Sequence, residues 1–205
     1  MQVTVTYRVA DDALIIDYEA VCDKNTPINL TNHAYFNLDG YLNGGIEKHT
    51  LWMDCDRFNE VNDVLIPTGK LIPVAGTPYD FLQEKALGKD FDADHPHMKQ
   101  CQGYDTNFFV RDYTGDLRHI ATLKGESGRT MRVYSDQPCV QIYTANMVNP
   151  EDPAFKGDKK QYKHCAVAME TQAMPDAINQ PGFTEVVLRP GEEYNKTTVF
   201  DFSNK

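Results

Sequence analysis

The stretch VTVTYRV, residues 3–9, alternates apolar and polar side chains, and LIIDYEA, residues 14–20, continues the pattern after a turn at Asp11 and Asp12. Successive side chains of a β-strand point to opposite faces, so strict alternation predicts a strand with one apolar face. Two such runs separated by a short acidic turn predict a β-hairpin. The chain therefore begins as an antiparallel β protein.

The same two-residue period recurs in short segments along the rest of the chain, and Gly, Pro, Asp or Asn fall in most of the gaps between them. Further strands are predicted at 50–54, 64–67, 107–111, 117–123, 130–135, 138–146, 164–171, 184–189 and 194–202. Only residues 78–87, which are followed by Gly88, have the pattern of a short helix. Regularly spaced short strands with almost no helix predict an all-β fold, a large antiparallel β-sandwich.

The chain has 205 residues, of which 41 % are hydrophobic, enough for one domain with a sizeable core. No repeat, low-complexity tract or linker interrupts it, so residues 1–205 are expected to form a single domain. The polar stretch 149–163 contains Pro and Gly and is expected to be a surface loop. The longest apolar runs, such as 13–16, are far shorter than the ~20 residues of a membrane span.

The charge and the cysteines of the chain indicate which partners and which cellular compartment to expect. The net charge of −10 repels phosphate backbones and anionic lipids, so we expect neither nucleic acid nor a membrane as a partner. The five cysteines form no CxxC pair and their number is odd, which favours reduced thiols. The N-terminus has neither the basic nor the apolar region of a secretory signal, so we expect a cytoplasmic protein.

Three polar segments are candidates for chemistry. NLTNHAYFNL, residues 29–38, contains three Asn, one His and two aromatic residues, although such amides often only bond nearby backbone. GYDTNF, residues 103–108, places Asp105 just before an apolar strand, where an Asx turn is the common alternative. In the third segment Glu170 ends the apolar run 165–169, so burial of its carboxylate is expected to require a partner or a chemical role.

Two other polar patterns are weaker candidates. The residues Asp90, Asp92 and Asp94 begin like a calcium loop, but His95 stands where that loop needs Gly and Cys101 where it needs the closing Glu. His95 and His97 have the spacing of metal ligands on a strand, but Pro96 between them favours a solvated loop. We expect no metal site.

Taken in order, TNHAYFNL (31–38), GYDTNF (103–108), METQAMPDAINQPGF (169–183) and LRPGEEY (188–194) resemble the aldose 1-epimerase, or galactose mutarotase, family. The segment 127–146, which precedes the Glu170 strand, is also similar to that family. The resemblance extends from Val3 to Phe202. Relative to full-length members of the family, it corresponds to the C-terminal part of the domain, without the N-terminal strands that carry an Arg and a further His of the sugar site.

The resemblance implies a large antiparallel sandwich that binds a sugar in an open groove on one sheet, without a metal or cofactor. His33 matches the general acid of the family and Glu170 the general base. Asp105 and Gln141 match residues that hydrogen-bond sugar hydroxyls, and Tyr35 lies in the segment that lines the substrate. We expect these side chains to converge on one groove, with the tips of His33 and Glu170 about one sugar ring apart.

The implied reaction interconverts the α and β anomers of free hexoses such as galactose or glucose. A base removes the proton of the anomeric hydroxyl, an acid protonates the ring oxygen, the ring opens to the aldehyde and then recloses on the other face. An imidazole has an ordinary pKa of ~6.5 and a glutamate of ~4.3, so near neutrality one can donate and the other accept a proton.

Two alternatives remain beside this interpretation. A hexose-phosphate mutarotase of the same superfamily would need clustered arginines, whereas Arg57, Arg111, Arg118, Arg129 and Arg132 are scattered through the sequence. A carbohydrate-binding relative without turnover is the other alternative. Because a sandwich without its N-terminal strands leaves strand edges unpaired, we also expect self-association, through residues 2–9.

Overall fold

The hairpin predicted from the first twenty residues is present in the computed structural model, which describes residues 1–149, 151, 158 and 160–202. Strands β1 (Gln2–Ala10) and β2 (Ala13–Val21) pair antiparallel along their whole length. The turn between them has Asp11 at φ 52°, a left-handed conformation that tight hairpin turns require. The alternating pattern of the sequence therefore forms the ladder that it predicted.

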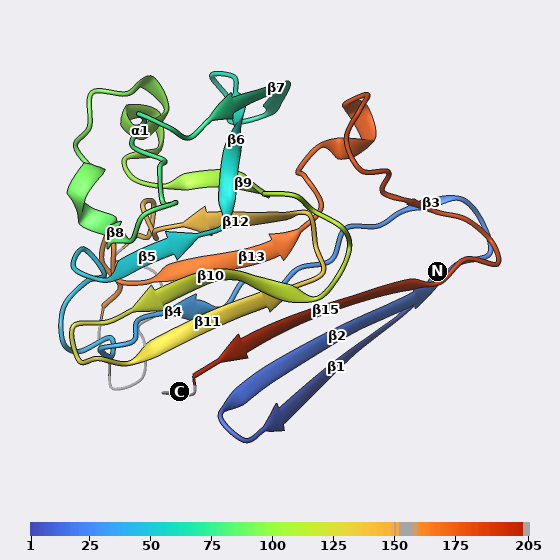
Figure 1. Ribbon diagram of the computed structural model, residues 1–205, viewed down its shortest axis with the longest axis horizontal. Coiled ribbons are helices and arrows are strands. Elements are labelled where there is room, and N and C mark those ends of the chain that lie inside the picture. Colours follow the sequence, from blue (N-terminus) through green and yellow to red (C-terminus); the bar gives the residue numbers. More distant parts are fainter. Residues whose placement is uncertain (150, 152–157, 159, 203–205) are drawn as a thin grey trace.

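Within the described residues the hairpin belongs to a seven-stranded sheet with the order β1-β2-β15-β11-β10-β5-β8 (Figure 1). Its other members are β15 (Tyr194–Asp201), β11 (Thr130–Ser135), β10 (Arg118–Lys124), β5 (Thr50–Met53) and β8 (Lys85–Ala86). The last strand of the chain, β15, lies between the first hairpin and the middle of the sheet, which joins the two ends of the sequence.

A second sheet of six strands has the order β4-β13-β12-β9-β6-β7 among the described residues. Its members are β4 (Tyr35–Phe36), β13 (Val167–Gln172), β12 (Cys139–Tyr143), β9 (Asp105–Val110), β6 (Cys55–Val61) and β7 (Pro67–Pro73). The short strands β14 (Val187–Leu188) and β3 (Thr26–Pro27) form a separate pair. Every strand pair that the structure describes is antiparallel.

The two large sheets enclose one main hydrophobic core, so the predicted antiparallel sandwich is confirmed. Both sheets contribute fully buried side chains to it, among them Leu123, Val133 and Phe200 from the larger sheet and Phe108, Ile142 and Val167 from the smaller. Burying one such side chain contributes about 1.5–3 kcal/mol, and this packing fixes which face of each strand points outward. The prediction of a single domain over residues 1–205 stays a prediction.

The predicted helix at residues 78–87 is wrong. The segment is a loop that ends in β8, followed by the 3-10 turn η1 (Leu87–Asp90). Tyr79 and Phe81 are fully buried, and the Tyr79 ring stacks on Phe58 with ring centroids 4.3 Å apart. Burial of these two rings decides the path of the segment against its local helical pattern.

The residues around His97 also differ from expectation. Instead of a solvated loop they form the one α-helix of the described residues, α1 (Pro96–Cys101), with Pro96 in its first turn. Proline lacks the N–H that a helix start would leave unpaired, so it favours that position. His97 is buried against the Tyr79 ring.

Other boundaries shift by a few residues. The strand predicted at 64–67 begins only at Pro67 and runs on as β7, while β6 was not predicted at all. The strands predicted at 138–146, 164–171 and 184–189 are shorter, as β12, β13 and β14, and the 3-10 turn η2 spans Ala177–Asn179. Of the predicted loop 149–163, residues 150, 152–157 and 159 lie outside the described residues. No helix in the described part of the chain is long and apolar enough to cross a membrane.

Candidate active site

The middle of the six-stranded sheet brings three of the predicted site residues together on one face. Gln141 of β12 lies directly opposite Glu170 of β13, and Tyr143, two residues further along β12, lies opposite Asp105 of β9. Residues directly opposite each other, and residues two apart, share a face of the sheet. The intervening Ile142 belongs to the core, so this shared face is the outer one.

The segment that carries His33 is tethered to both ends of β13. Before His33, the side-chain amide of Asn29 exchanges two hydrogen bonds with the backbone of Ala173, at 3.0 and 2.9 Å. After it, Asn37 donates from Nδ2 to the carbonyl oxygen of Cys165 at 2.9 Å. Because β13 lies between Cys165 and Ala173, these asparagines hold the segment across the strand that carries Glu170.

Between these tethers, Nε2 of His33 lies 3.4 Å from Oε1 of Glu170. Half of the His33 side chain is exposed, whereas Glu170 is buried. Next to them, Gln141 donates from Nε2 to Oδ1 of Asp105 at 2.7 Å. The imidazole and the carboxylate are therefore in direct polar contact, closer than the width of a sugar ring that we expected between their tips.

Burial shifts the pKa values of both carboxyl groups upward. For Glu170 the loss of water is the largest cause of the raised pKa, and the negative charge of Asp105 raises it further, while the imidazole of His33 opposes the shift. For Asp105 burial again raises the pKa most, against the hydrogen bond from Gln141 and the nearby His33. A carboxyl group whose proton is held more tightly is a better proton acceptor once it is ionised.

Aromatic rings surround the His33 imidazole. The ring of Tyr35 lies 5.0 Å from it between centroids, and the ring of Tyr143 lies 6.1 Å from it. Tyr35 is in β4, at the edge of the sheet, and pairs with Ala168 of β13. Tyr143 was not among the predicted site residues, although its position two residues after Gln141 in a strand places it on the same face. Burial raises the pKa of the Tyr35 hydroxyl, which stays protonated near neutrality.

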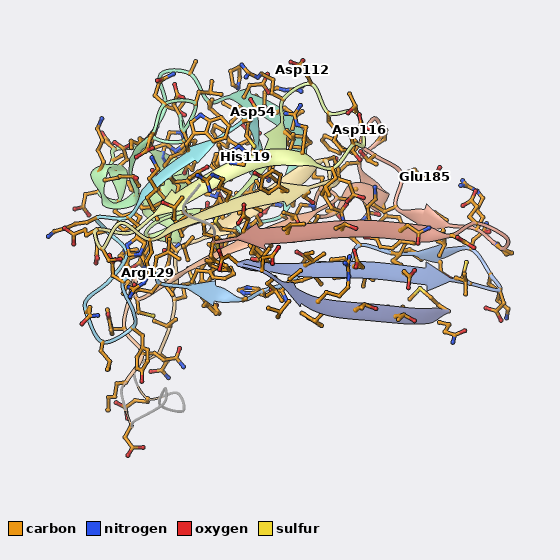
Figure 2. All side chains as sticks on the ribbon, turned by 60° about the horizontal axis from the view of Figure 1, so that its bottom comes forward. Asp54, Asp112, Asp116, His119, Arg129 and Glu185 are labelled. Carbon is orange, nitrogen blue, oxygen red and sulfur yellow. The ribbon has the colours of Figure 1, made fainter. Side chains whose placement is uncertain are left out.

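A cavity of about 500 Å³ shares Tyr35 with the site and is also lined by Phe36, Arg129 and Phe202; Arg129 is labelled in Figure 2. In the described part of the chain no three His, Cys, Asp or Glu side chains are grouped as a metal site requires. The arrangement combines a proton donor and a proton acceptor with two further hydrogen-bonding groups, which suits a ligand rich in hydroxyl groups.

The family model for aldose 1-epimerase matches residues 1–201. Galactose mutarotase of Rattus norvegicus is 40 % identical over 210 residues, which cover 99 % of this chain and 58 % of the relative. Aldose 1-epimerase of Escherichia coli K12 is 34 % identical over 97 % of this chain and 58 % of its own length. The chain thus spans less than two thirds of the length of these relatives.

Solved structures agree with the sequence matches. An aldose epimerase homologue from C. elegans superposes with a TM-score of 0.83 at 30 % identity, over 97 % of this chain and 58 % of that protein. Galactose 1-epimerase from Lactobacillus acidophilus NCFM gives the same TM-score at 25 % identity, over 98 % of this chain and 56 % of its own. With the match of the family model over nearly all of its residues, the chain belongs to the aldose 1-epimerase family.

Proposed function

We propose that this protein acts as a hexose mutarotase that interconverts the α and β anomers of free galactose or glucose. The observation that carries the proposal is the contact of His33 and Glu170 beside the Gln141–Asp105 hydrogen bond. The family of the chain supports the same reaction.

In this reaction Glu170 removes the proton of the anomeric hydroxyl while His33 protonates the ring oxygen. Both oxygens are bonded to the anomeric carbon, so an acid and a base whose nearest atoms are 3.4 Å apart need to separate only slightly to reach them. The ring opens to the aldehyde, the anomeric carbon rotates, and reclosure reverses the two roles. Gln141 and Asp105 bind hydroxyl groups and hold the ring in place, and Tyr35 lines its edge. Positioned proton transfer contributes about 10²–10⁴-fold in rate.

The free thiols and the net charge of the protein bear on its cellular compartment and on the charge of its substrate. All five cysteines are free and four of them are buried, which supports a reducing compartment such as the cytoplasm. The net charge of −10 favours a neutral substrate over nucleic acid or an anionic membrane.

Polarimetry of the purified chain with fresh α-D-galactose, and separately with α-D-glucose, tests the proposal. We expect the optical rotation to reach equilibrium faster than in buffer alone, in proportion to protein concentration. Sugar binding by calorimetry without any acceleration would contradict the proposal and leave a carbohydrate-binding protein without turnover.

A hexose 6-phosphate offered in the same assay distinguishes the phosphate-specific alternative. Arg111 and Arg118 both pair with Asp54, which is labelled in Figure 2, at 2.7 and 2.6 Å. These two guanidinium groups are therefore engaged by a carboxylate. We expect the free hexose to be the better substrate.

A further inference from the structure

Asp105 is the first residue of β9, and it lies opposite Tyr143, the last residue of β12 (Figure 1). Just beyond this pair, Thr144 donates its backbone N–H to the carbonyl oxygen of Tyr104 at 3.0 Å. Hydrogen-bonded and non-hydrogen-bonded pairs alternate along an antiparallel ladder, so the Asp105–Tyr143 pair is a non-hydrogen-bonded one. The bonds that hold the start of β9 to β12 are therefore those of Tyr104, the residue before Asp105.

A side chain completes this last pair of the ladder. Tyr104 donates its backbone N–H to Oγ1 of Thr144 at 3.0 Å, where an ordinary antiparallel pair would use the carbonyl oxygen of Thr144. That carbonyl oxygen instead accepts from Nδ1 of His164 at 3.0 Å, and the His164 ring stacks on Phe91 with ring centroids 4.0 Å apart. The backbone turns away at Ala145, which has a left-handed φ of 50°. The Thr144 hydroxyl thus continues the ladder where the backbone leaves it.

Asn146 closes these contacts into a ring of hydrogen bonds. Its Nδ2 donates to the carbonyl oxygen of Tyr104 at 2.8 Å, and its Oδ1 accepts from Oγ1 of Thr144 at 2.7 Å. The same Oγ1 accepts the backbone N–H of Tyr104, so both backbone groups of Tyr104 are bound. The carbonyl of Tyr104 belongs to the peptide group that leads into Asp105. Asn146 therefore holds the peptide group through which Asp105 joins the preceding chain.

The ring of hydrogen bonds lies inside the protein. Tyr104 and Thr144 are fully buried, and Asn146 is 6 % exposed. Away from water, a donor or acceptor that loses its partner is costly, and hydrogen bonds in a connected network strengthen one another. The arrangement that satisfies Tyr104, Thr144 and Asn146 together is consequently a rigid one.

Gly103 shows how closely Asn146 approaches the backbone before Asp105. Gly103 has a φ of 147°, and a Cβ atom at this position would lie 2.2 Å from Oδ1 of Asn146. Glycine is the residue that allows such a conformation and such a close approach. The first residue of the GYD segment is therefore explained by the side chain of Asn146.

We propose that Asn146 is a positioning residue for Asp105 in the sugar site. The inference rests on the mutarotase function proposed above. Gln141 fixes the carboxylate of Asp105 through the hydrogen bond at 2.7 Å, and Asn146 fixes its backbone from the other side. The carboxylate is thereby held in place before a sugar arrives, which reduces the entropy lost on binding.

A double-mutant cycle distinguishes the positioning of Asp105 from general support of the fold. Asn146→Ala should lower kcat/KM for hexose mutarotation about tenfold or more, because a displacement of about 1 Å can cost about 10²-fold in rate. In an Asp105→Ala background the same change should have almost no effect, because the group that Asn146 positions is absent. Equal losses in the two backgrounds would overturn the proposal.

The hydroxyl of Thr144 provides a milder pair of variants. Thr144→Val keeps the shape of the side chain but leaves the N–H of Tyr104 without its acceptor, whereas Thr144→Ser keeps the hydroxyl. Thr144→Val should therefore lower kcat/KM as Asn146→Ala does, and Thr144→Ser should stay close to the wild type. If Asn146→Ala does not fold, Thr144→Val takes its place in the cycle with Asp105→Ala. Equal kcat/KM in Thr144→Val and the wild type would contradict the proposal.

Ser135 of β11 offers a matched control in the other sheet. Its buried hydroxyl accepts the N–H of Gln137 at 3.1 Å and donates to the carbonyl oxygen of Thr197 at 3.2 Å. Ser135→Ala should lower stability against urea about as much as Thr144→Val does, because each change removes a buried hydroxyl that binds backbone. It should leave kcat/KM unchanged. A loss of kcat/KM as large as that in Thr144→Val would assign both effects to the fold and overturn the proposal.

A measurement without sugar separates this proposal from the proposed function. The side-chain amide of Gln141 reports where Asp105 lies, because it donates to the Asp105 carboxylate. In NMR spectra that correlate amide nitrogen and hydrogen, this signal should move in Asn146→Ala toward its position in Asp105→Ala, and it should stay in place in Ser135→Ala. A wild-type chain without mutarotation would contradict the proposed function alone. A Gln141 signal that does not move in Asn146→Ala would overturn the positioning role, whether or not the chain is active.

Discussion

The side-chain amide of Asn29 and the backbone of Ala173 exchange two hydrogen bonds, although the two residues are 144 positions apart in the sequence. Ala173 directly follows β13, the strand of Glu170, and Asn29 precedes His33 by four residues. The proposed acid is therefore positioned relative to the proposed base through a hydrogen-bonded pair that contains neither of them.

Replacing Asn29 tests this positioning. Asn29→Ala leaves the buried backbone N–H and C=O of Ala173 without partners, which costs about 1–3 kcal/mol in the free energy of unfolding. Turnover should fall more than sugar affinity, because His33 loses its tether while Gln141 and Asp105 keep their places. Urea denaturation and polarimetry measure the two effects. Asn195→Ala, at an exposed asparagine of β15, is the matched control and should change neither quantity.

The proposed base is tested by Glu170→Gln. The amide keeps the shape of the side chain but cannot accept the anomeric proton, so turnover should fall about 10²–10⁴-fold, or about 3–5 kcal/mol of transition-state stabilisation. Sugar binding measured by calorimetry should stay nearly intact. His33→Asn should behave in the same way, because it removes the acid. Wild-type turnover in Glu170→Gln would exclude Glu170 as the base.

The parts of the fold that follow from local patterns were predictable from the sequence. Alternation in 3–9 and 14–20 predicted β1 and β2. Successive side chains of a strand lie on opposite faces, so the sequence alone shows that one face is apolar. The interval 78–87 shows where this reasoning fails. Its local pattern favours a helix, but Tyr79 and Phe81 gain more by filling the core against residues distant in the sequence.

The candidate site, too, was predictable only in part from the sequence. Resemblance to a family identified His33 and Glu170, and strand alternation could have added Tyr143, which shares the face of Gln141. The contact of His33 with Glu170 depends on tethers between distant segments, such as that from Asn37 to Cys165. An asparagine in a loop gives no sign in the sequence of which distant backbone group it will bind.

The hydrogen bond from Gln141 to Asp105 has a measurable electrostatic effect. It lowers the pKa of Asp105, opposing the larger effect of burial, so Gln141→Leu should raise that pKa further. NMR titration of the Asp105 carboxyl carbon measures the shift. Asp105→Ala should weaken both sugar affinity and turnover, because it removes hydroxyl contacts made in the ground state and in the transition state. An Asp105 titration that does not change in Gln141→Leu would show that this hydrogen bond does not form in solution.

The raised pKa of Glu170 predicts how stability depends on pH. Burial is its main cause, Asp105 adds to it, and the facing imidazole of His33 opposes it. The folded state therefore holds the Glu170 proton more tightly than the unfolded state, whose carboxyl group titrates near ~4.3. The stability that this proton contributes is fully present below that value, and it is lost as the pH rises through the raised pKa of the folded state.

Glu170→Gln removes this loss, so the variant should be as stable as the wild type in acid and more stable near neutrality. Urea denaturation across that range measures the difference, with Glu19→Gln, at an exposed carboxylate of β2, as the control for loss of a surface charge. If Glu170→Gln becomes less stable than the wild type as the pH rises, the ion pair with His33 outweighs burial, and the site holds Glu170 in its charged form.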